Sequence, residues 1–131
     1  YHVREIWAYN CAFDKGSLKR LFGEDWEMIS NMVTFYDIIP AILYSKLLTK
    51  KYVKWCNNNG FITQKGNVMT KAEIVYKYLF NDLTFEEEHT GLSDCKIEYK
   101  ILLKAIHSGK KIDRKVPSVE SIQNVLRNGG Y

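Results

Sequence analysis

The chain has 131 residues, of which 46% are hydrophobic and 26% are charged, so it can bury a core and does not have the composition of a disordered segment. Its net charge of +4 suits an anionic partner such as nucleic acid, and no apolar run approaches the roughly 20 residues of a membrane-spanning helix. The three widely spaced cysteines do not have the spacing of a structural zinc site, and they predict a reduced, cytoplasmic setting.

Two short strands, each followed by a helix, are predicted in the first part of the chain. Residues 5–9 are apolar, β-branched or aromatic, and residues 13–22 carry apolar side chains at near-helical spacing up to a glycine. Residues 32–36 are the second strand candidate, and residues 38–57 predict one long amphipathic helix. Because a helix connects the two strands, we expect them to pair in parallel.

The rest of the chain predicts helices around one small hairpin. The expected elements are a hairpin over residues 61–69 that turns at Lys65, a helix from 70 to about 80, a helix after His89 and a last helix over residues 116–127. The first of these helices begins with Thr70 and Glu73 at the spacing of a capping box. The helix after His89 is expected to bury an apolar stripe that consists of Leu92, Ile97, Ile101, Leu102 and Ala105.

Basic residues form two groups that a polyanion could contact. The first group recurs at helical spacing and consists of Lys46, Lys50, Lys51 and Lys54. The second group consists of Lys110, Lys111, Arg114 and Lys115. Such a group is more often a solvated face than a phosphate site, so both interpretations stay open.

Two segments carry side chains typical of a catalytic site. In WAYNCAFD, residues 7–14, Asp14 opens a helix where a strand ends, and this position faces the crevice in which open α/β sheets place ligands. Its carboxylate could instead accept hydrogen bonds from the first N–H groups of that helix. In EEEHTGLSD, residues 86–94, His89 and Asp94 are five residues apart, so on a helix both could aim at one small object. A surface histidine and aspartate near a helix start also occur together by chance.

Together these segments resemble the second and third motifs of the DEDDh 3′–5′ exonucleases, the proofreading-subunit family. The second motif is a strand followed by N-x-x-x-D, which matches Asn10 and Asp14. The third motif is H-x-A-x-x-D, which matches His89 and Asp94 with Gly91 in place of the alanine. Within the family, the pattern is most similar to that of phage-encoded exonucleases.

The resemblance covers about residues 4–107 and implies an α/β, RNase H-like exonuclease fold that is helix-rich towards its C-terminus. Residues 1–131 would then be one portion of a single exonuclease domain, located in the cytoplasm of a bacterium or of a phage-infected host.

The resemblance also implies how such a site would work. Hydrolysis of a phosphodiester needs an activated water and compensation of developing negative charge, which two hard divalent ions, Mg²⁺ or Mn²⁺, can supply. Asp94 would bind the first ion directly, and Asp14 would hold the second largely through water. His89 would be the general base, a task that suits an imidazole at neutral pH. The residues expected to contact a DNA or RNA strand with a free 3′ end are Asn10, Phe13 and Lys65.

The family's first motif, D-x-E on an earlier strand, has no accepted counterpart here. The only D-x-E is residues 25–27, which follow the Asn motif in an expected polar loop and are therefore rejected. We therefore expect this chain to be the C-terminal portion of the domain, and a missing N-terminal segment or a second chain would complete the sheet. The strand near Ile6 would then have one bare edge, and the isolated chain would be inactive.

Two other interpretations stay open. One is a non-catalytic nucleic-acid-binding module that keeps the remnant of the fold and its basic faces, and the other is a helical interaction protein in which both motifs are coincidental. The exonuclease hypothesis makes the sharper prediction, which is that Asn10, Asp14, His89 and Asp94 converge in one cleft.

Overall fold

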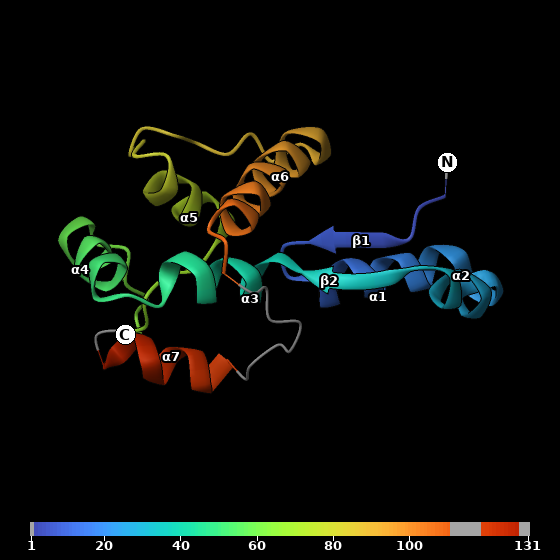
Figure 1. The fold of residues 1–131 in the computed structure, drawn as a ribbon, viewed down its shortest axis with the longest axis horizontal. Coiled ribbons are helices and arrows are strands. Elements are labelled where there is room, and N and C mark those ends of the chain that lie inside the picture. Colours follow the sequence, from blue (N-terminus) through green and yellow to red (C-terminus); the bar gives the residue numbers. More distant parts are fainter. Residues whose placement is uncertain (1, 111–118, 129–131) are drawn as a thin grey trace. The chain divides into compact units, whose positions relative to one another are not determined.

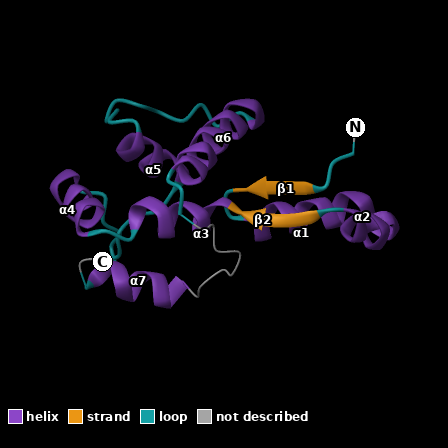
Figure 2. Cartoon of the chain, in the orientation of Figure 1, coloured by secondary structure: helices purple, strands orange, loops and turns teal. Residues whose placement is uncertain are grey.

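The structure of the protein is a computed structural model that describes residues 2–110 and 119–128 and divides the chain into two compact units, Tyr1–Ile39 and Pro40–Tyr131 (Figure 1). Helices make up most of both units, and the two strands both belong to the first (Figure 2). The span that the sequence presents as one domain portion therefore contains two units.

Unit 1 is a two-stranded parallel sheet with helices attached. Its elements are β1 (Glu5–Ala8), α1 (Cys11–Phe22), the 3₁₀ turn η1 (Gly23–Asp25), α2 (Trp26–Met32) and β2 (Thr34–Asp37). The strands pair in parallel with Ile6 opposite Phe35, which confirms the predicted pairing. The register also brings Trp7 opposite Tyr36, and their rings stack with centroids 4.6 Å apart. The connection between the strands consists of α1, η1 and α2, and α1 contacts both strands.

The helical parts of unit 1 differ from the expectations in two ways. The predicted apolar side of α1 is not covered, since Phe13 is 69% exposed and Leu21 is 75% exposed. The rejected D-x-E segment, residues 25–27, is not a loop but the end of η1 and the start of α2. It is helical rather than extended, so it does not have the strand that the family's first motif requires.

We expect the second edge of β1 to be covered by a further strand in the complete protein. In a parallel pair, alternate amides of each strand point away from the partner, and bare edges recruit other strands. Exchange of the β1 amide protons, followed by NMR, should therefore be slower in the complete protein than in the 131-residue chain. Fast exchange of these amides in both proteins would contradict this expectation.

Unit 2 consists of helices packed around aliphatic and aromatic side chains. Its elements are α3 (Ile38–Ile42, which begins at the end of unit 1), the π-helical turn η2 (Leu43–Leu47), α4 (Lys50–Asn59), α5 (Ala72–Leu79), α6 (Gly91–His107) and α7 (Val119–Arg127). Helix α5 lies beside α6, and α4 contacts α7. Fully buried side chains include Tyr52, Val75, Ile101 and Leu126, and the Tyr52 hydroxyl donates a 2.6 Å hydrogen bond to the Met69 carbonyl.

The prediction of one continuous helix over residues 38–57 is wrong, because the helix is interrupted at Leu48 and Thr49. Thr49 is extended, with φ −132° and ψ 151°, and its hydroxyl accepts a 3.2 Å hydrogen bond from the Tyr52 amide. A threonine in this geometry starts a new helix because it satisfies an N–H group that has no partner inside the helix. Helix α4 ends at Asn59, and Gly60 after it adopts the left-handed conformation with φ 75°, as a glycine that follows a helix commonly does.

Replacing Thr49 with alanine is expected to lower the free energy of unfolding by about 1 kcal/mol, because the first turn of α4 loses its cap. Urea unfolding followed by circular dichroism measures this change. Thr49→Ser keeps the hydroxyl and should stay near the wild-type stability. A serine variant as unstable as the alanine variant would show that the hydrogen bond is not the cause.

Three further expectations for unit 2 are corrected. The hairpin over residues 61–69 is reduced to one antiparallel bridge between Ile62 and Val68 around the turn. The predicted start of the next helix is shifted, because α5 begins at Ala72 after the N-cap residue Lys71, which makes no side-chain cap, and the Glu73 carboxylate pairs with Lys77 at 3.4 Å. Leu92 is 70% exposed, so the buried stripe of α6 starts only in its second turn.

Some expectations fall outside the described residues. These are the positions of Lys111, Arg114 and Lys115 in the second basic group, and the start of the last helix at residues 116–118. In the part of the chain that the structure describes, no helix has the length and apolar character needed to cross a bilayer.

Candidate catalytic and metal site

The first candidate segment surrounds the start of α1, at the carboxyl ends of the two parallel strands. Asn10 precedes the helix in the left-handed conformation, with φ 64°, and Asp14 is the fourth helical residue. The carboxylate of Asp37, at the end of β2, accepts hydrogen bonds from the amides of Asn10 at 3.1 Å and Cys11 at 3.0 Å. Asp37 therefore satisfies the N–H groups that Asp14 could have satisfied. Asp37, and not Asp14, therefore caps the start of α1.

The second candidate segment surrounds the start of α6 and repeats this design. His89 lies just before the N-cap residue Thr90 and is also left-handed, with φ 53°. Thr90 and Ser93 form a capping box in which each side-chain oxygen accepts from the other residue's amide at 3.3 Å. Asp94 is the fourth residue of α6, as Asp14 is of α1. In both helices other residues do the capping, so neither aspartate is needed for it.

The conformation of His89 corrects the expectation that His89 and Asp94 lie on the same helix. His89 is not on the helix face with Asp94, because it precedes the helix and turns the chain through a positive φ. A non-glycine residue in this region is strained, and such positions are concentrated at functional sites. The turn brings the imidazole back towards the start of α6.

Glu87 joins His89 and Asp94 in one cluster. Each of the three side chains offers a ligand atom, and these atoms all lie within 4.8 Å of one another. The His89 Nδ1 atom lies 3.6 Å from Glu87 Oε2, with the imidazole 77% exposed and the Glu87 side chain only 17% exposed. Asp94 Oδ1 is buried and has no hydrogen-bond partner among the described residues. A buried carboxylate oxygen without a partner is costly, so it needs a proton or a cation.

The electrostatics of Glu87 fit a cation at this cluster. Burial raises the pKa of the Glu87 carboxyl above its usual range, and the neighbouring carboxylate of Asp94 raises it further. A divalent ion would relieve the repulsion between these two carboxylates and would give the buried Asp94 oxygen a partner. Carboxylate oxygens suit Mg²⁺ and Mn²⁺. The residues of this half-site therefore fit the expected metal.

Replacing Glu87 with glutamine is expected to stabilise the folded chain at pH 7 when divalent ions are absent. A carboxyl whose pKa is raised on folding stabilises the protein fully below the ordinary value of 4.5, and this contribution is lost as the pH rises through the folded value. Because the glutamine cannot ionise, the stability difference between Glu87→Gln and wild type should grow from about pH 4 to pH 7. Thermal unfolding at both pH values measures it.

Two comparisons separate this effect from a general change of charge. Glu86→Gln removes the neighbouring exposed carboxylate and should show no such pH dependence. Added Mn²⁺ should raise the melting temperature of wild type more than that of Glu87→Gln. A stability difference that is constant across this pH range would contradict the assigned environment of Glu87.

Glu87 was not singled out from the sequence, although EEEH contains a usable signal. In an extended chain, alternate side chains point to the same side. Glu87 and His89 accordingly contact each other, while Glu86 and Glu88 line a separate cavity of about 250 Å³ together with Ser93. A glutamate two residues before a histidine is therefore the sequence signal for the contact between Glu87 and His89.

The remaining predicted site residues are exposed. Phe13 is 69% exposed on the first turn of α1, and Lys65 lies in the exposed turn where the Gly66 amide donates to the Thr63 carbonyl. Their role as substrate contacts stays a prediction. Because Asn10 and Asp14 belong to unit 1 and the His89 segment to unit 2, the convergence of the four motif residues also stays a prediction.

The two buried cysteines, Cys11 and Cys56, do not offer a nucleophile that competes with this site. Burial, with the nearby charges of Asp37 and Asp14, raises the pKa of the Cys11 thiol, and burial raises the pKa of Cys56 to about 11. Both thiols therefore stay protonated at neutral pH and are poor nucleophiles. All three cysteines are free thiols.

No model of a known protein family matches the chain, and neither a curated protein nor a solved structure matches it. What the chain does must therefore be inferred from its own residues and their geometry.

Proposed function

We propose that this chain is part of a metal-dependent 3′–5′ exonuclease of the DEDDh type, which hydrolyses phosphodiester bonds at the 3′ ends of DNA or RNA. The observation that carries the proposal is the cluster at the start of α6, where the ligand atoms of Glu87, His89 and Asp94 lie within 4.8 Å of one another. The equivalent start of α1, with Asn10 and Asp14 at the carboxyl ends of two parallel strands, supports it.

Each residue of the cluster has a role that its surroundings support. Asp94 and Glu87 would hold one divalent ion, and Asp14 would help to hold a second when the two segments converge. The bound ions would supply charge compensation and make an attacking water more acidic. His89 would accept the proton from that water, and its exposed ring can reach a substrate. Because the Glu87 carboxylate lies 3.6 Å from Nδ1, it would stabilise the imidazolium that forms.

The proposal includes a larger sheet than these two strands. An RNase H-like fold would place further strands beside β1, and one of them would carry the D-x-E motif that contributes the remaining metal ligands. A segment outside these residues, or a second chain, would provide them. The free thiols support a reduced cytoplasmic setting in a bacterial or phage-infected cell.

The decisive test compares the complete gene product with the 131-residue chain on an oligonucleotide labelled near its 3′ end, with Mn²⁺ and with EDTA. We expect release of 3′ nucleotides by the complete protein only in Mn²⁺, and negligible release by the shorter chain. Robust metal-dependent cleavage by the shorter chain would show that the site does not need the D-x-E carboxylates. No cleavage by the complete protein would favour a non-catalytic nucleic-acid-binding module, a second candidate that the lysine-rich cavities described next also support.

A further inference from the structure

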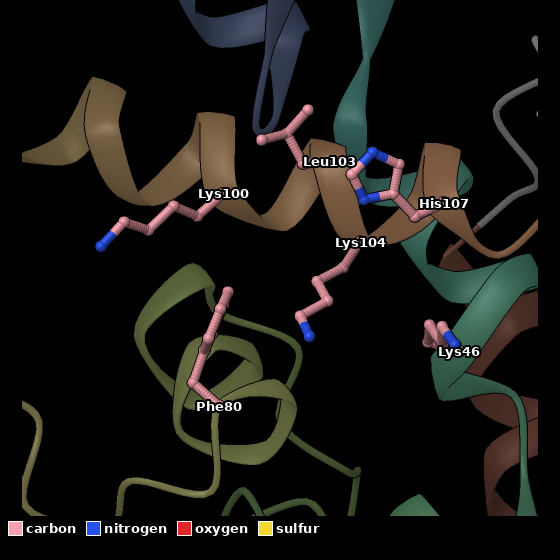
Figure 3. A pocket seen from close by; sticks show the side chains of 6 residues that line it. All are labelled: Lys46, Phe80, Lys100, Leu103, Lys104 and His107. Carbon is pink, nitrogen blue, oxygen red and sulfur yellow. The ribbon is translucent and has the colours of Figure 1, made fainter.

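Two adjoining cavities in unit 2 are lined by lysines and aromatic rings. The first has a volume of about 390 Å³ and is lined by Lys46, Phe80, Lys100, Leu103, Lys104 and His107. The second has a volume of about 440 Å³, and its lining includes Lys46, Lys51, Trp55, Tyr78, Asn81 and Lys104. In Figure 3, Lys104 extends from α6 on the side of Phe80, which directly follows α5, whereas Lys100 extends from α6 away from the other labelled side chains and Lys46 lies on η2. Because Lys46 and Lys104 line both cavities, the two form one continuous basic site.

Among the described residues, no carboxylate lines either of these two cavities, although Lys100 also lines a third cavity together with Glu86 and Glu88. Two ion pairs within the described part of the chain join Lys77 to Glu73 and His89 to Glu87, and neither includes a lysine of the site. The Lys104 ammonium instead lies 5.0 Å from the centre of the Phe80 ring. Several like charges that share one hollow without a counter-charge attract an anionic ligand.

Trp55 and Tyr78 form an aromatic wall of the second cavity, which the packing of unit 2 holds in place. The Trp55 ring lies 5.2 Å from the Tyr78 ring and 5.1 Å from the Phe61 ring, measured between centroids. Trp55 is nevertheless only half-buried and lines the second cavity. A fixed, partly exposed indole is a platform on which a nucleobase can stack whatever its sequence.

We propose that the Lys46–Lys104 site binds a short stretch of single-stranded nucleic acid, with phosphates on the lysines and a base against Trp55. A strand fits better than a free mononucleotide, because lysines from η2, α4 and α6 follow one another along two adjoining cavities. This site is distinct from the metal cluster, since Lys104 is ten residues beyond Asp94 on α6, or about 15 Å along the helix. It requires no metal, so it goes beyond the proposed exonuclease activity and can be tested without it.

The experiment measures binding of a fluorescent dT10 strand to the 131-residue chain by anisotropy, in EDTA so that no metal-dependent cleavage occurs. The double variant Lys46→Gln/Lys104→Gln removes the two lysines that line both cavities. Its matched control is Lys50→Gln/Lys54→Gln, which removes the same charge from exposed lysines of α4 outside the cavity linings. If Lys104→Gln impairs folding through its contact with Phe80, Lys46→Gln/Lys51→Gln takes its place.

We expect the cavity variant to bind dT10 about 10- to 30-fold more weakly near 0.1 M salt, and the slope of log K against log salt to fall by about 1.4, as for two lost phosphate contacts. The control variant should change binding by no more than about twofold. A decamer of the same length without bases should bind several-fold more weakly than dT10, because it cannot stack on Trp55.

Three outcomes would overturn the proposal. Equal losses in the cavity and control variants would mean that binding is diffuse and not located in this site. A free deoxythymidine monophosphate that binds as tightly as dT10 would mean a mononucleotide site rather than a strand site. Equal affinity for the abasic and normal decamers would remove the role of the aromatic wall. None of these results depends on whether the complete protein cleaves nucleic acid, so this proposal and the exonuclease proposal can fail separately.

Discussion

If the chain is part of the proposed exonuclease, replacing His89 with alanine in the complete protein is expected to lower kcat by about 10²- to 10⁴-fold, which is the usual contribution of a positioned general base. Metal binding should survive, because the carboxylates of Glu87 and Asp94 remain. The Michaelis constant should change little, since His89 acts on the attacking water and not on the bound strand. Single-turnover release of the 3′ nucleotide at saturating Mn²⁺ measures the effect.

The pH dependence of His89→Ala separates a general base from a residue that only supports the fold. The pH–rate profile of the wild type should contain a step that His89→Ala lacks, because only the wild type has the proposed general base. His2→Ala is the matched control, because His2 is an exposed histidine in the other unit and should leave the rate unchanged. A variant that keeps the wild-type rate would remove His89 from the mechanism.

Replacing Asp94 with alanine should instead damage the metal site. The affinity for Mn²⁺ is expected to fall by more than the roughly 10- to 100-fold that is typical when a residue supporting a metal ligand is removed. Part of the activity should return at high Mn²⁺, because Glu87 and the ligands outside this cluster remain. Activity titrated against Mn²⁺ concentration in the complete protein measures this shift.

The fold should tolerate the loss of Asp94. Its carboxylate raises the pKa of Glu87 and has one buried oxygen without a partner, so its removal relieves repulsion rather than breaking a stabilising pair. Glu88→Ala is the matched control, since Glu88 belongs to the same segment but lines the cavity on its other side. Equal Mn²⁺ titrations for Asp94→Ala and wild type would show that Asp94 is not a ligand.

Features that depend on neighbouring residues could be predicted from the sequence. The parallel pairing of the strands at Ile6 and Phe35 follows from a helix between two short apolar runs, and it is confirmed. The end of α4 at Gly60 follows from the freedom of glycine to adopt a positive φ. The start of α6 just after His89 is also confirmed. The two helix ends are local features that backbone sterics and short-range hydrogen bonds decide, whereas the strand pairing follows from the helical connection between the strands.

Features that depend on distant residues required the tertiary structure. Asp37 reaches back across 27 residues to the amide of Asn10, and no local pattern distinguishes it from an aspartate that merely ends a strand. Glu87 meets Asp94 only because the positive φ of His89 turns the chain before α6. Lys46 and Lys104 are 58 residues apart in the sequence, and the packing of the helices brings them to one cavity. Residue types and spacings thus indicated the kind of chemistry, while the packing of the chain decided which side chains meet, because such contacts depend on the whole core and not on local sequence.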